Sequence, residues 1–407
     1  MAWEQWVAVA ALVLAVVAVT IGIVAWRAVR SRTPTFSVPD AEVGAPTSTG
    51  PPAVVVNPSK TADVAALRRL VERTAAEAGL GEPLWFETTV ADPGVGQARE
   101  AVARGASVVV AAGGDGTMRA VGKALAGTGV PMGVVPLGTG NLLARNLDIP
   151  LGSQRETVAV ALTGRDRAMD LGWLRTEPLT PAEEATVEGR PAVSTARSAQ
   201  DATTAEAADA SELDPAVPTS GAADGQADPE EEHVFLVIGG LGFDAAMVSG
   251  ADDELKAKLG WIAYFVAGAQ HLTGRKVRAT AQLGESGRSE PFTARTILIA
   301  NCGRLPGGVV LFPDAQLDDG WLDIAVLDTK GGLIGWADLL RKVTLQGLGI
   351  RKDRMPYTTG SIEFRRTRSL VVRTEEPEHV QVDGDLVGYA TTVHARVEKG
   401  GLVVRTP

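Results

Sequence analysis

Two glycine-rich stretches and one asparagine turn carry groups that could hold a phosphate ester. Gly113 to Thr117 and Gly138 to Asn141 each follow an apolar run, and Asn57 follows a third run at residues 53–56. Glycines leave main-chain N–H groups open to a bulky anion, and a following helix adds its own N–H groups. Asp115 would repel a phosphate unless a divalent cation lay between them. The alternative is that Asp115 caps an ordinary strand-to-helix turn.

Two carboxylates near the end of the chain could supply a base. Asp383 and Asp385 flank Gly384 between apolar segments, and an acid at this point could accept the proton of an attacking hydroxyl. The same three residues are also typical of a hairpin turn. Taken alone, they favour the hairpin turn.

These groups need elements that bring them to one place. The predicted strands of the first part are 53–56, 84–90, 107–112 and 132–136, and the predicted helices are 64–78, 97–104 and 118–125. Alternation of strand and helix predicts a parallel sheet, whose carboxyl edge is where such sheets bind ligands. From His233 onward, short alternating strands, among them residues 292–301, predict a second, sandwich-like β unit.

The Asn57-Pro58 start and the two glycine loops, in this order, resemble the catalytic domain of the diacylglycerol kinase and sphingosine kinase superfamily, of the bacterial lipid kinase type. The resemblance covers residues 53–176 and 233–406. It implies an α/β nucleotide-binding domain with a Rossmann-like parallel sheet, a β-rich C-terminal domain, and ATP and Mg²⁺ as cofactors. The sequence motifs of P-loop kinases and protein kinases are absent.

The resemblance also implies roles for single residues. Asp115 and Asp385 would be catalytic, although Asp385 stands where the family often has Glu and reaches one methylene less far. A loop at residues 312–321 would hold a structural magnesium through Asp319 and the main-chain carbonyls of Gln316 and Trp321, the alternative being a solvated acidic turn. Asp244 would orient the acceptor head group. The implied nucleotide-binding residues are Asn57, Thr89, Gly113, Gly114, Asp115, Gly116, Thr117, Gly138, Thr139, Gly140 and Asn141.

Charge and cysteine content exclude some classes of protein. The net charge is −10, but residues 177–232 hold 14 acidic and 2 basic residues, so the remainder is close to neutral. This distribution lacks the basic surface of a nucleic-acid binder. The single cysteine, Cys302, excludes an intramolecular disulfide and suits a reducing cytosol. Whether the chain forms a homo-oligomer stays open.

The first 32 residues predict a membrane anchor. Trp3 to Trp26 is almost wholly apolar, long enough to cross a hydrocarbon core of ~30 Å, and is followed directly by Arg27, Arg30 and Arg32. The arginines predict a single-pass protein of the cell membrane with the catalytic domains in the cytoplasm. The alternative is a buried core helix.

The organisation that we predict has four parts and one insertion. A transmembrane anchor at 1–32 and a flexible tether at 33–52 precede the nucleotide-binding domain at 53–165 and the β-rich substrate domain at 166–407. Residues 177–232 have almost no large apolar side chains and predict a disordered acidic insertion. A tolerated surface insertion is the favoured interpretation, against repulsion from anionic lipid or regulation by phosphorylation.

The function predicted from the sequence is a membrane-anchored kinase that transfers the γ-phosphate of ATP to a lipid hydroxyl. Diacylglycerol is the expected acceptor, which would give phosphatidic acid; a sphingoid base or another lipid is an alternative. An NAD kinase-like enzyme is the nearest rival, because it shares the Gly113–Thr117 pattern. A non-catalytic, nucleotide-sensing membrane scaffold is a rival of another class.

Overall fold

The computed structural model describes residues 50–188, 232–242, 276–285, 287–304, 310–329 and 360–407. The predicted anchor at 1–32, most of the tether and Asp244 lie outside the described residues. Among the helices that are described, none combines the length and the apolar composition needed to cross a membrane. The predicted anchor therefore stays a prediction.

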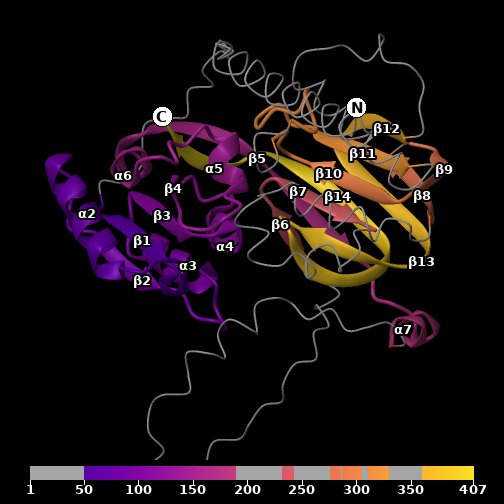
Figure 1. The fold of residues 1–407 in the computed structure, drawn as a ribbon, viewed down its shortest axis with the longest axis horizontal. Coiled ribbons are helices and arrows are strands. Elements are labelled where there is room, and N and C mark those ends of the chain that lie inside the picture. The colour runs from indigo at the N-terminus through magenta and orange to yellow at the C-terminus, as the bar shows by residue number, and fades with distance from the viewer. Residues whose placement is uncertain (1–49, 189–231, 243–275, 286, 305–309, 330–359) are drawn as a thin grey trace, which may run out of the picture.

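The N-terminal unit is the predicted α/β layer (Figure 1). Its strands are β1 (Pro52–Val56), β2 (Leu84–Glu87), β3 (Val108–Gly113) and β4 (Met132–Pro136). All pair in parallel, in the spatial order β2-β1-β3-β4. The chain leaves β1 toward β2 and then continues on the opposite side of β1 with β3, so the sheet reverses its strand order there. Ligands of open α/β sheets bind beyond the carboxyl ends of the strands at such a reversal.

Helices connect and cover these strands. They are η1 (Pro58–Lys60), α2 (Val64–Glu77), α3 (Val95–Ala103), α4 (Asp115–Leu125), α5 (Leu142–Asn146) and α6 (Gln154–Thr163). In α2, Leu67, Val71 and Ala75 are spaced by four residues and are all buried against the sheet. Asp63 caps this helix, because its carboxylate accepts the Ala66 N–H at 2.7 Å. Every residue of β1 and β3 is buried, as expected for strands covered on both faces.

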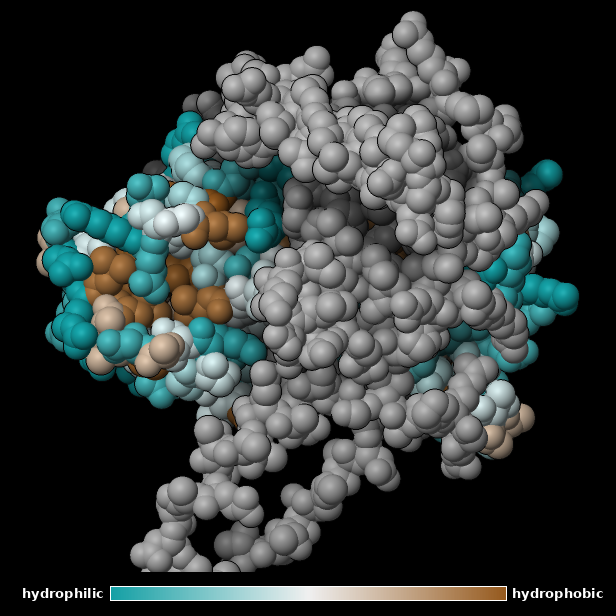
Figure 2. Space-filling view, viewed as in Figure 1, coloured by the Kyte–Doolittle hydropathy of each residue, from teal (hydrophilic) through white to brown (hydrophobic). Residues whose placement is uncertain are grey.

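Strand β2 is the free edge of this sheet, and its aromatic side chains reach the surface. Figure 2 shows apolar side chains on the N-terminal unit, among hydrophilic ones. Trp85 and Phe86 are half-buried, and the guanidinium groups of Arg68 and Arg104 lie over their rings at 5.6 and 5.4 Å from the ring centroids. Cations placed on the rings of an edge strand limit its tendency to pair with other chains.

The C-terminal unit is β-rich, as predicted. Its strands are β5 (Arg165–Thr176), β6 (His233–Phe235), β7 (Ile238–Leu241), β8 (Val277–Leu283), β9 (Ser289–Ala294), β10 (Thr296–Ala300), β11 (Leu322–Thr329), β12 (Gly360–Thr367), β13 (Ser369–Val382) and β14 (Asp385–Thr406). β13 pairs with β8 through its first half and with β7 through its last three residues. A register shift between Arg373 and Glu378 separates the two halves, which lets one strand serve two parts of the sheet.

Strand β14 joins the two units. It pairs with β13 from Asp385 to Arg396 and with β5 from Val393 to Thr406. Near its end, Val404 pairs in parallel with Met132 of β4, so the strands of both units form one continuous sheet. Figure 1 shows the C-terminus lying beside the N-terminal unit.

The structure differs from the sequence-based expectation at several places. The strand predicted at 84–90 ends at Glu87, so Thr89 lies beyond it. Helix α4 begins at Asp115, so Gly116 and Thr117 lie in its first turn and not in a loop before it. The predicted strand 292–301 is two strands, β9 and β10, which pair with different partners. Within 177–232, which we expected to be disordered, residues Pro181–Glu188 form helix α7, and residues 189–231 lie outside the described residues.

Asp170 of β5 is a buried carboxylate that holds three segments together. Its two oxygens accept the N–H groups of Gly320 at 2.6 Å and Gly400 at 2.7 Å. Its own N–H donates to the Leu317 carbonyl at 2.6 Å. Burial raises the pKa of Asp170 against the opposing effect of these amides. The 312–321 loop is therefore fixed to the middle of β14.

We predict that Asp170→Ala lowers the free energy of unfolding by about 2–5 kcal/mol, because the buried Gly320 N–H and the partly buried Gly400 N–H lose their acceptor. Asp318→Ala is the control: it removes a partly exposed ion pair with Arg167, with a cost of about 1 kcal/mol or less. Urea unfolding followed by circular dichroism measures both. Equal losses for the two variants would contradict this role for Asp170.

Candidate functional site

The two glycine loops lie against each other at the carboxyl ends of β3 and β4. The Leu137 N–H donates to the Gly113 carbonyl at 2.8 Å. A Cβ added to Gly138 would lie 2.9 Å from Gly114 Cα, a separation that real Cβ atoms do not show. Only glycine at position 138 allows this approach. The structure therefore brings together the two loops that the sequence placed at one sheet edge.

Asp115 connects the loops through its side chain. Its Oδ1 accepts the Leu142 N–H at 2.7 Å, and a Cβ on Gly140 would lie 2.7 Å from its Oδ2. Burial raises the pKa of Asp115 to about 6; the Leu142 hydrogen bond opposes this, and the negative charges of Asp383 and Asp385 add to it. A carboxylate that is buried beside two others is a site that a cation would stabilise.

Asn141 lies between the loops in a left-handed conformation, with φ 49° and ψ 47°. Its Nδ2 donates to the Gly138 carbonyl at 2.7 Å. Its Oδ1 is buried and has no hydrogen-bond partner among the described residues. Buried amide oxygens are normally paired, so this oxygen marks a place where a ligand or its solvent completes the site. Arg145, one turn further on, donates from Nε to the Gly140 carbonyl at 3.0 Å.

The loop residues fit a triphosphate and its cation. The first main-chain bond within α4 is that of the Met118 N–H to the Gly114 carbonyl, so the preceding amides of the first turn have no acceptor within the helix. A Cβ on Gly114 would meet only Gly138 Cα, at 3.8 Å, which leaves open space over this residue. Free amides, open space and one carboxylate are the features that a cation-bound phosphate requires.

The Asp383-Gly384 pair forms the predicted hairpin turn, with φ of 49° and 88°. Both positive angles are those of the two-residue turn that joins tight hairpins. Asp383 is buried, and its carboxylate accepts the N–H groups of Leu236, Val237 and Ile238 at 2.8 to 2.9 Å. Burial raises the pKa of Asp383, while Arg119 and these three amides oppose the rise. Asp383 is thus the structural member of the pair.

Asp385 opens β14 and its side chain is 42% exposed. Its Oδ2 lies 2.6 Å from Nη2 of Arg119, which comes from α4 of the other unit. The structure therefore brings the predicted base to the helix that begins with Asp115. The hairpin turn is present, and the carboxylate predicted as the base directly follows it, so the two alternatives that the sequence offered are compatible.

The other residues predicted to contact the nucleotide differ in their exposure and in their distance from the glycine loops. Asn57 bonds to Ser59 through its side chain, and its N–H donates to the Ala112 carbonyl at 2.8 Å, next to the glycine loop. Thr89 is exposed, and its hydroxyl accepts the Asp92 N–H at 3.0 Å within its own turn. Thr117 is buried, with 2% of the residue exposed, and its side chain packs on Gly113. Thr139 is exposed between the two glycines of its loop.

The predicted magnesium loop is an acidic turn whose carboxylates pair with two arginines, Arg167 at Asp318 and Arg366 at Asp319. Asp319 accepts the Trp321 N–H at 3.0 Å and pairs with Arg366, which also pairs with Asp323 at 3.1 Å. Burial raises the pKa of Asp323 to about 6; Arg366 lowers it, and the charges of Asp319 and Asp314 raise it further. Gln316 is exposed. No cluster of three metal-ligating side chains lies within the described ranges, whereas the predicted site uses one side chain and two carbonyls.

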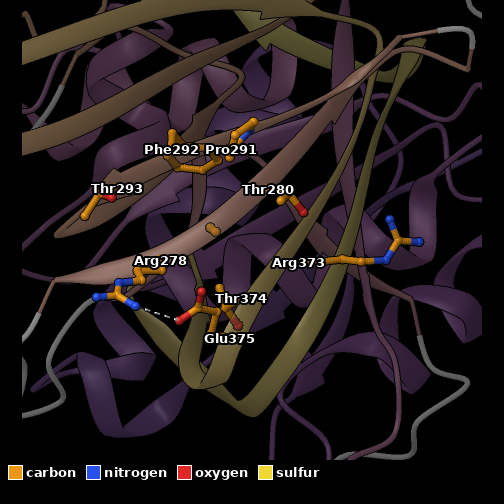
Figure 3. A pocket seen from close by; sticks show the side chains of 9 residues that line it. Arg278, Thr280, Pro291, Phe292, Thr293, Arg373, Thr374 and Glu375 are labelled. Carbon is orange, nitrogen blue, oxygen red and sulfur yellow. Dashed lines mark ion pairs between the residues drawn. The ribbon is translucent and has the colours of Figure 1, made fainter.

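A separate pocket of about 410 Å³ lies on strands β8, β9 and β13 (Figure 3). Arg278 and Glu375 form an ion pair across it at 3.6 Å, and Thr280, Phe292 and Arg373 also line it. None of the predicted site residues lines this pocket. The pocket is therefore distinct from the candidate site at the glycine loops.

Sequence reasoning missed two residues of the site, Arg119 and Arg145, and it did not assign Asp383 its structural role. Arg119 contacts the predicted base, Arg145 contacts the second glycine loop, and Asp383 fixes the turn that precedes the predicted base. Arg119 follows Asp115 by four residues on the same helix, so helical spacing could have identified it. The role of Asp383 depends on the 236–238 segment, which is far away in the sequence.

Two family models match the chain. Residues 51–174 match the diacylglycerol kinase catalytic domain, and residues 238–404 match the YegS C-terminal NAD kinase beta sandwich-like domain. The first match contains both glycine loops, and the second contains Asp385 and the 312–321 loop.

Individual proteins and solved structures also resemble this chain. A probable lipid kinase YegS-like protein of Pseudomonas fluorescens is 27% identical over 286 residues, which are 68% of this chain and 73% of that protein. An uncharacterised protein of Synechocystis sp. is 28% identical over 289 residues, and the match spans only 51% of its length. The crystal structure of a diacylglycerol kinase from Bacillus anthracis has a TM-score of 0.59 at 17% identity, covering 89% of this chain and 99% of that one. This last likeness establishes the fold.

We predict that Gly114→Ala weakens Mg²⁺-ATP binding by about tenfold or more while leaving the melting temperature unchanged. The added Cβ meets no protein atom closer than 3.8 Å but occupies space over the main-chain amides. Gly152→Ala, where nothing lies within 4 Å, is the matched control outside the loops. Calorimetric titration with a non-hydrolysable ATP analogue measures affinity. Unchanged affinity in Gly114→Ala would place the phosphates elsewhere.

We also predict that cation-dependent nucleotide affinity falls as the pH drops below 6. The pKa of Asp115 is about 6, so a cation must displace a proton below that pH, which costs about tenfold in affinity per pH unit. Above pH 6 the carboxylate is already charged, and its contribution no longer depends on pH. Titrations between pH 5 and 8 in wild type and Asp115→Asn test this. A slope that Asp115→Asn retains in full would assign it to another group.

Proposed function

The chain belongs to the diacylglycerol kinase catalytic-domain family of the bacterial lipid kinase type, and from this we propose that it transfers the γ-phosphate of ATP to the hydroxyl group of a membrane lipid. Diacylglycerol is the acceptor that we propose first, giving phosphatidic acid. The observation that supports transfer most directly is the approach of Asp385, from the C-terminal unit, to the helix whose first residue is Asp115.

The two carboxylates have different surroundings and therefore different tasks. Asp115 is held by the Leu142 N–H and lies within the glycine loops, where the phosphates would bind. Asp385 is half exposed at the mouth of the hairpin turn, where an acceptor can reach it. This division matches what phosphoryl transfer requires, which is a fixed phosphate and an oriented acceptor.

The reaction that we propose forms one bond and breaks another. The acceptor oxygen bonds to the γ-phosphorus, the bond from that phosphorus to the β–γ bridging oxygen breaks, and ADP leaves. The hydroxyl proton passes to Asp385, which acts as the general base. Amides of the α4 first turn and of the second glycine loop would stabilise the phosphate charge. Mg²⁺, held beside Asp115, would neutralise the charge on the transferred group.

We also propose that the enzyme acts at the cell membrane, with its catalytic units in the cytoplasm. The apolar stretch from Trp3 to Trp26 and the arginines that follow it support this location. A lipid acceptor stays in the bilayer, so an anchored enzyme meets it without first extracting it.

We predict that Asp385→Asn lowers kcat by about 10²-fold or more, because the amide cannot accept the proton. Nucleotide affinity and the melting temperature should stay unchanged. Glu375→Gln, an exposed carboxylate outside the site, is the matched control. Full activity of Asp385→Asn would assign the base to another residue.

The acceptor class is tested with labelled ATP. Purified enzyme is offered diacylglycerol, a sphingoid base, a native lipid extract and NAD in separate reactions, and the products are identified by mass spectrometry. We expect label in a lipid product. Label in NAD alone would refute the lipid kinase proposal, and nucleotide binding without transfer to any acceptor would favour the scaffold.

A further inference from the structure

Helix α4 carries two residues that face the candidate site. Asp115 is its first residue, and Arg119 follows four residues later. Residues four apart lie on the same helical face, separated by about 6 Å along the axis. The backbone between them is regular helix, so the distance from the phosphate-binding end to Arg119 is fixed.

Arg119 holds the hairpin turn at two points. Its Nη2 lies 2.6 Å from Asp385 Oδ2, and its Nη1 donates to the Val382 carbonyl at 2.5 Å. Val382 and Asp385 are register partners that flank the turn. The arginine side chain is only 18% exposed, in contrast to the exposed arginines elsewhere on the helices of this unit. A planar guanidinium with two fixed contacts defines an orientation that a single flexible contact cannot.

The same turn is held from the opposite side. Asp383 accepts three main-chain N–H groups from residues 236–238, and its own N–H donates to the Ile238 carbonyl at 2.7 Å. Asp383 therefore fixes the turn within the C-terminal unit, whereas Arg119 connects it to the N-terminal unit. Without Arg119, the described contacts of the Asp385 side chain with the phosphate-binding helix are lost.

We propose that Arg119 is a positioning residue, which holds Asp385 at a fixed distance from the glycine loops. It does so from α4, the helix that begins at the first glycine loop, by binding the two residues that flank the hairpin turn, Val382 and Asp385. This inference rests on the proposed function, since it assigns Asp385 the role of base. It assigns no contact between Arg119 and ATP.

Two other roles for Arg119 give different results. An arginine that contacted the γ-phosphate would contribute to nucleotide affinity and would matter even in the absence of the base. An arginine that only joined the two units would lower stability and leave kcat unchanged. A positioning residue lowers kcat, leaves nucleotide affinity unchanged, and has no effect once its target is removed.

The test is a double-mutant cycle with Arg119→Met and Asp385→Asn. We expect Arg119→Met to lower kcat by about 10- to 10²-fold, as for a misplaced catalytic group. Affinity for the non-hydrolysable ATP analogue, measured without acceptor, should stay at the wild-type value. In the Asp385→Asn background, Arg119→Met should cause no further loss. The kcat of Arg119→Lys should fall between those of wild type and Arg119→Met, because lysine keeps the positive charge but cannot bind Val382 and Asp385 with two fixed nitrogens at once.

Arg405→Met is the matched control for lost stability. The Arg405 side chain is 11% exposed, against 18% for Arg119, and it pairs with Asp166 at 3.0 Å near the opposite end of β14. We expect it to lower the melting temperature and to leave kcat unchanged. If Arg119→Met is too unstable to purify, Arg119→Lys and Arg119→Gln complete the cycle.

The outcomes separate the inference from the proposed function. Weakened nucleotide binding, or a loss that persists in Asp385→Asn, would overturn positioning in favour of a direct phosphate contact. Unchanged kcat in Arg119→Met would overturn it outright. A wild-type enzyme that transfers phosphate to no lipid would overturn the proposed function, and this inference with it.

Discussion

The structure depends on one long strand that belongs to both units. Strand β14 has its first residue, Asp385, at the candidate site, and it ends beside β4 of the parallel sheet. A strand of 22 residues spans roughly 70 Å at about 3.3 Å per residue if straight, and its register shift near Glu398 bends it. Because its two ends are paired within different units, the position of Asp385 relative to the glycine loops is a property of the fold.

Two buried carboxylates connect β14 to neighbouring segments, one near its start and one beside Gly400. Asp383 accepts hydrogen bonds from three main-chain N–H groups near the start of β14. Asp170 accepts two, from Gly320 and Gly400. Burial opposes ionisation of each group, and the amides counter it, so a carboxylate is tolerated where backbone donors converge. Asp115 has a weaker set of donors, and the negative charges of Asp383 and Asp385 add to its burial. Of these three carboxylates, Asp115 is the one whose charged form a bound cation would stabilise most.

The sequence predicted the parts of the site that depend on local pattern. Glycines after buried strands indicated the two loops, and strand–helix alternation indicated their common edge, because both signals are short-range. Arg119 and the structural role of Asp383 were missed for a different reason. Their roles arise from contacts with Asp385 and with residues 236–238, and no local pattern encodes which distant segment will supply the partner. The first turn of α4 was assigned to a loop because Gly116 and the preceding cap residue Gly114 have low helix propensity, which the packing against the second loop overrides.

The loop at residues 312–321, which we predicted to hold magnesium, contributes to the scaffold more than to the chemistry. Its Gly320 is held by Asp170 beside Gly400, close to the register shift of β14, whereas Asp385 begins that strand. Arg366 already balances Asp319 and Asp323, so a cation held by Asp319 would have to share or replace that arginine. A cation bound there would stiffen the loop and, through Asp170, the bent part of β14. Its influence on phosphoryl transfer would then pass through the strand that presents Asp385, which fits a structural ion better than a catalytic one.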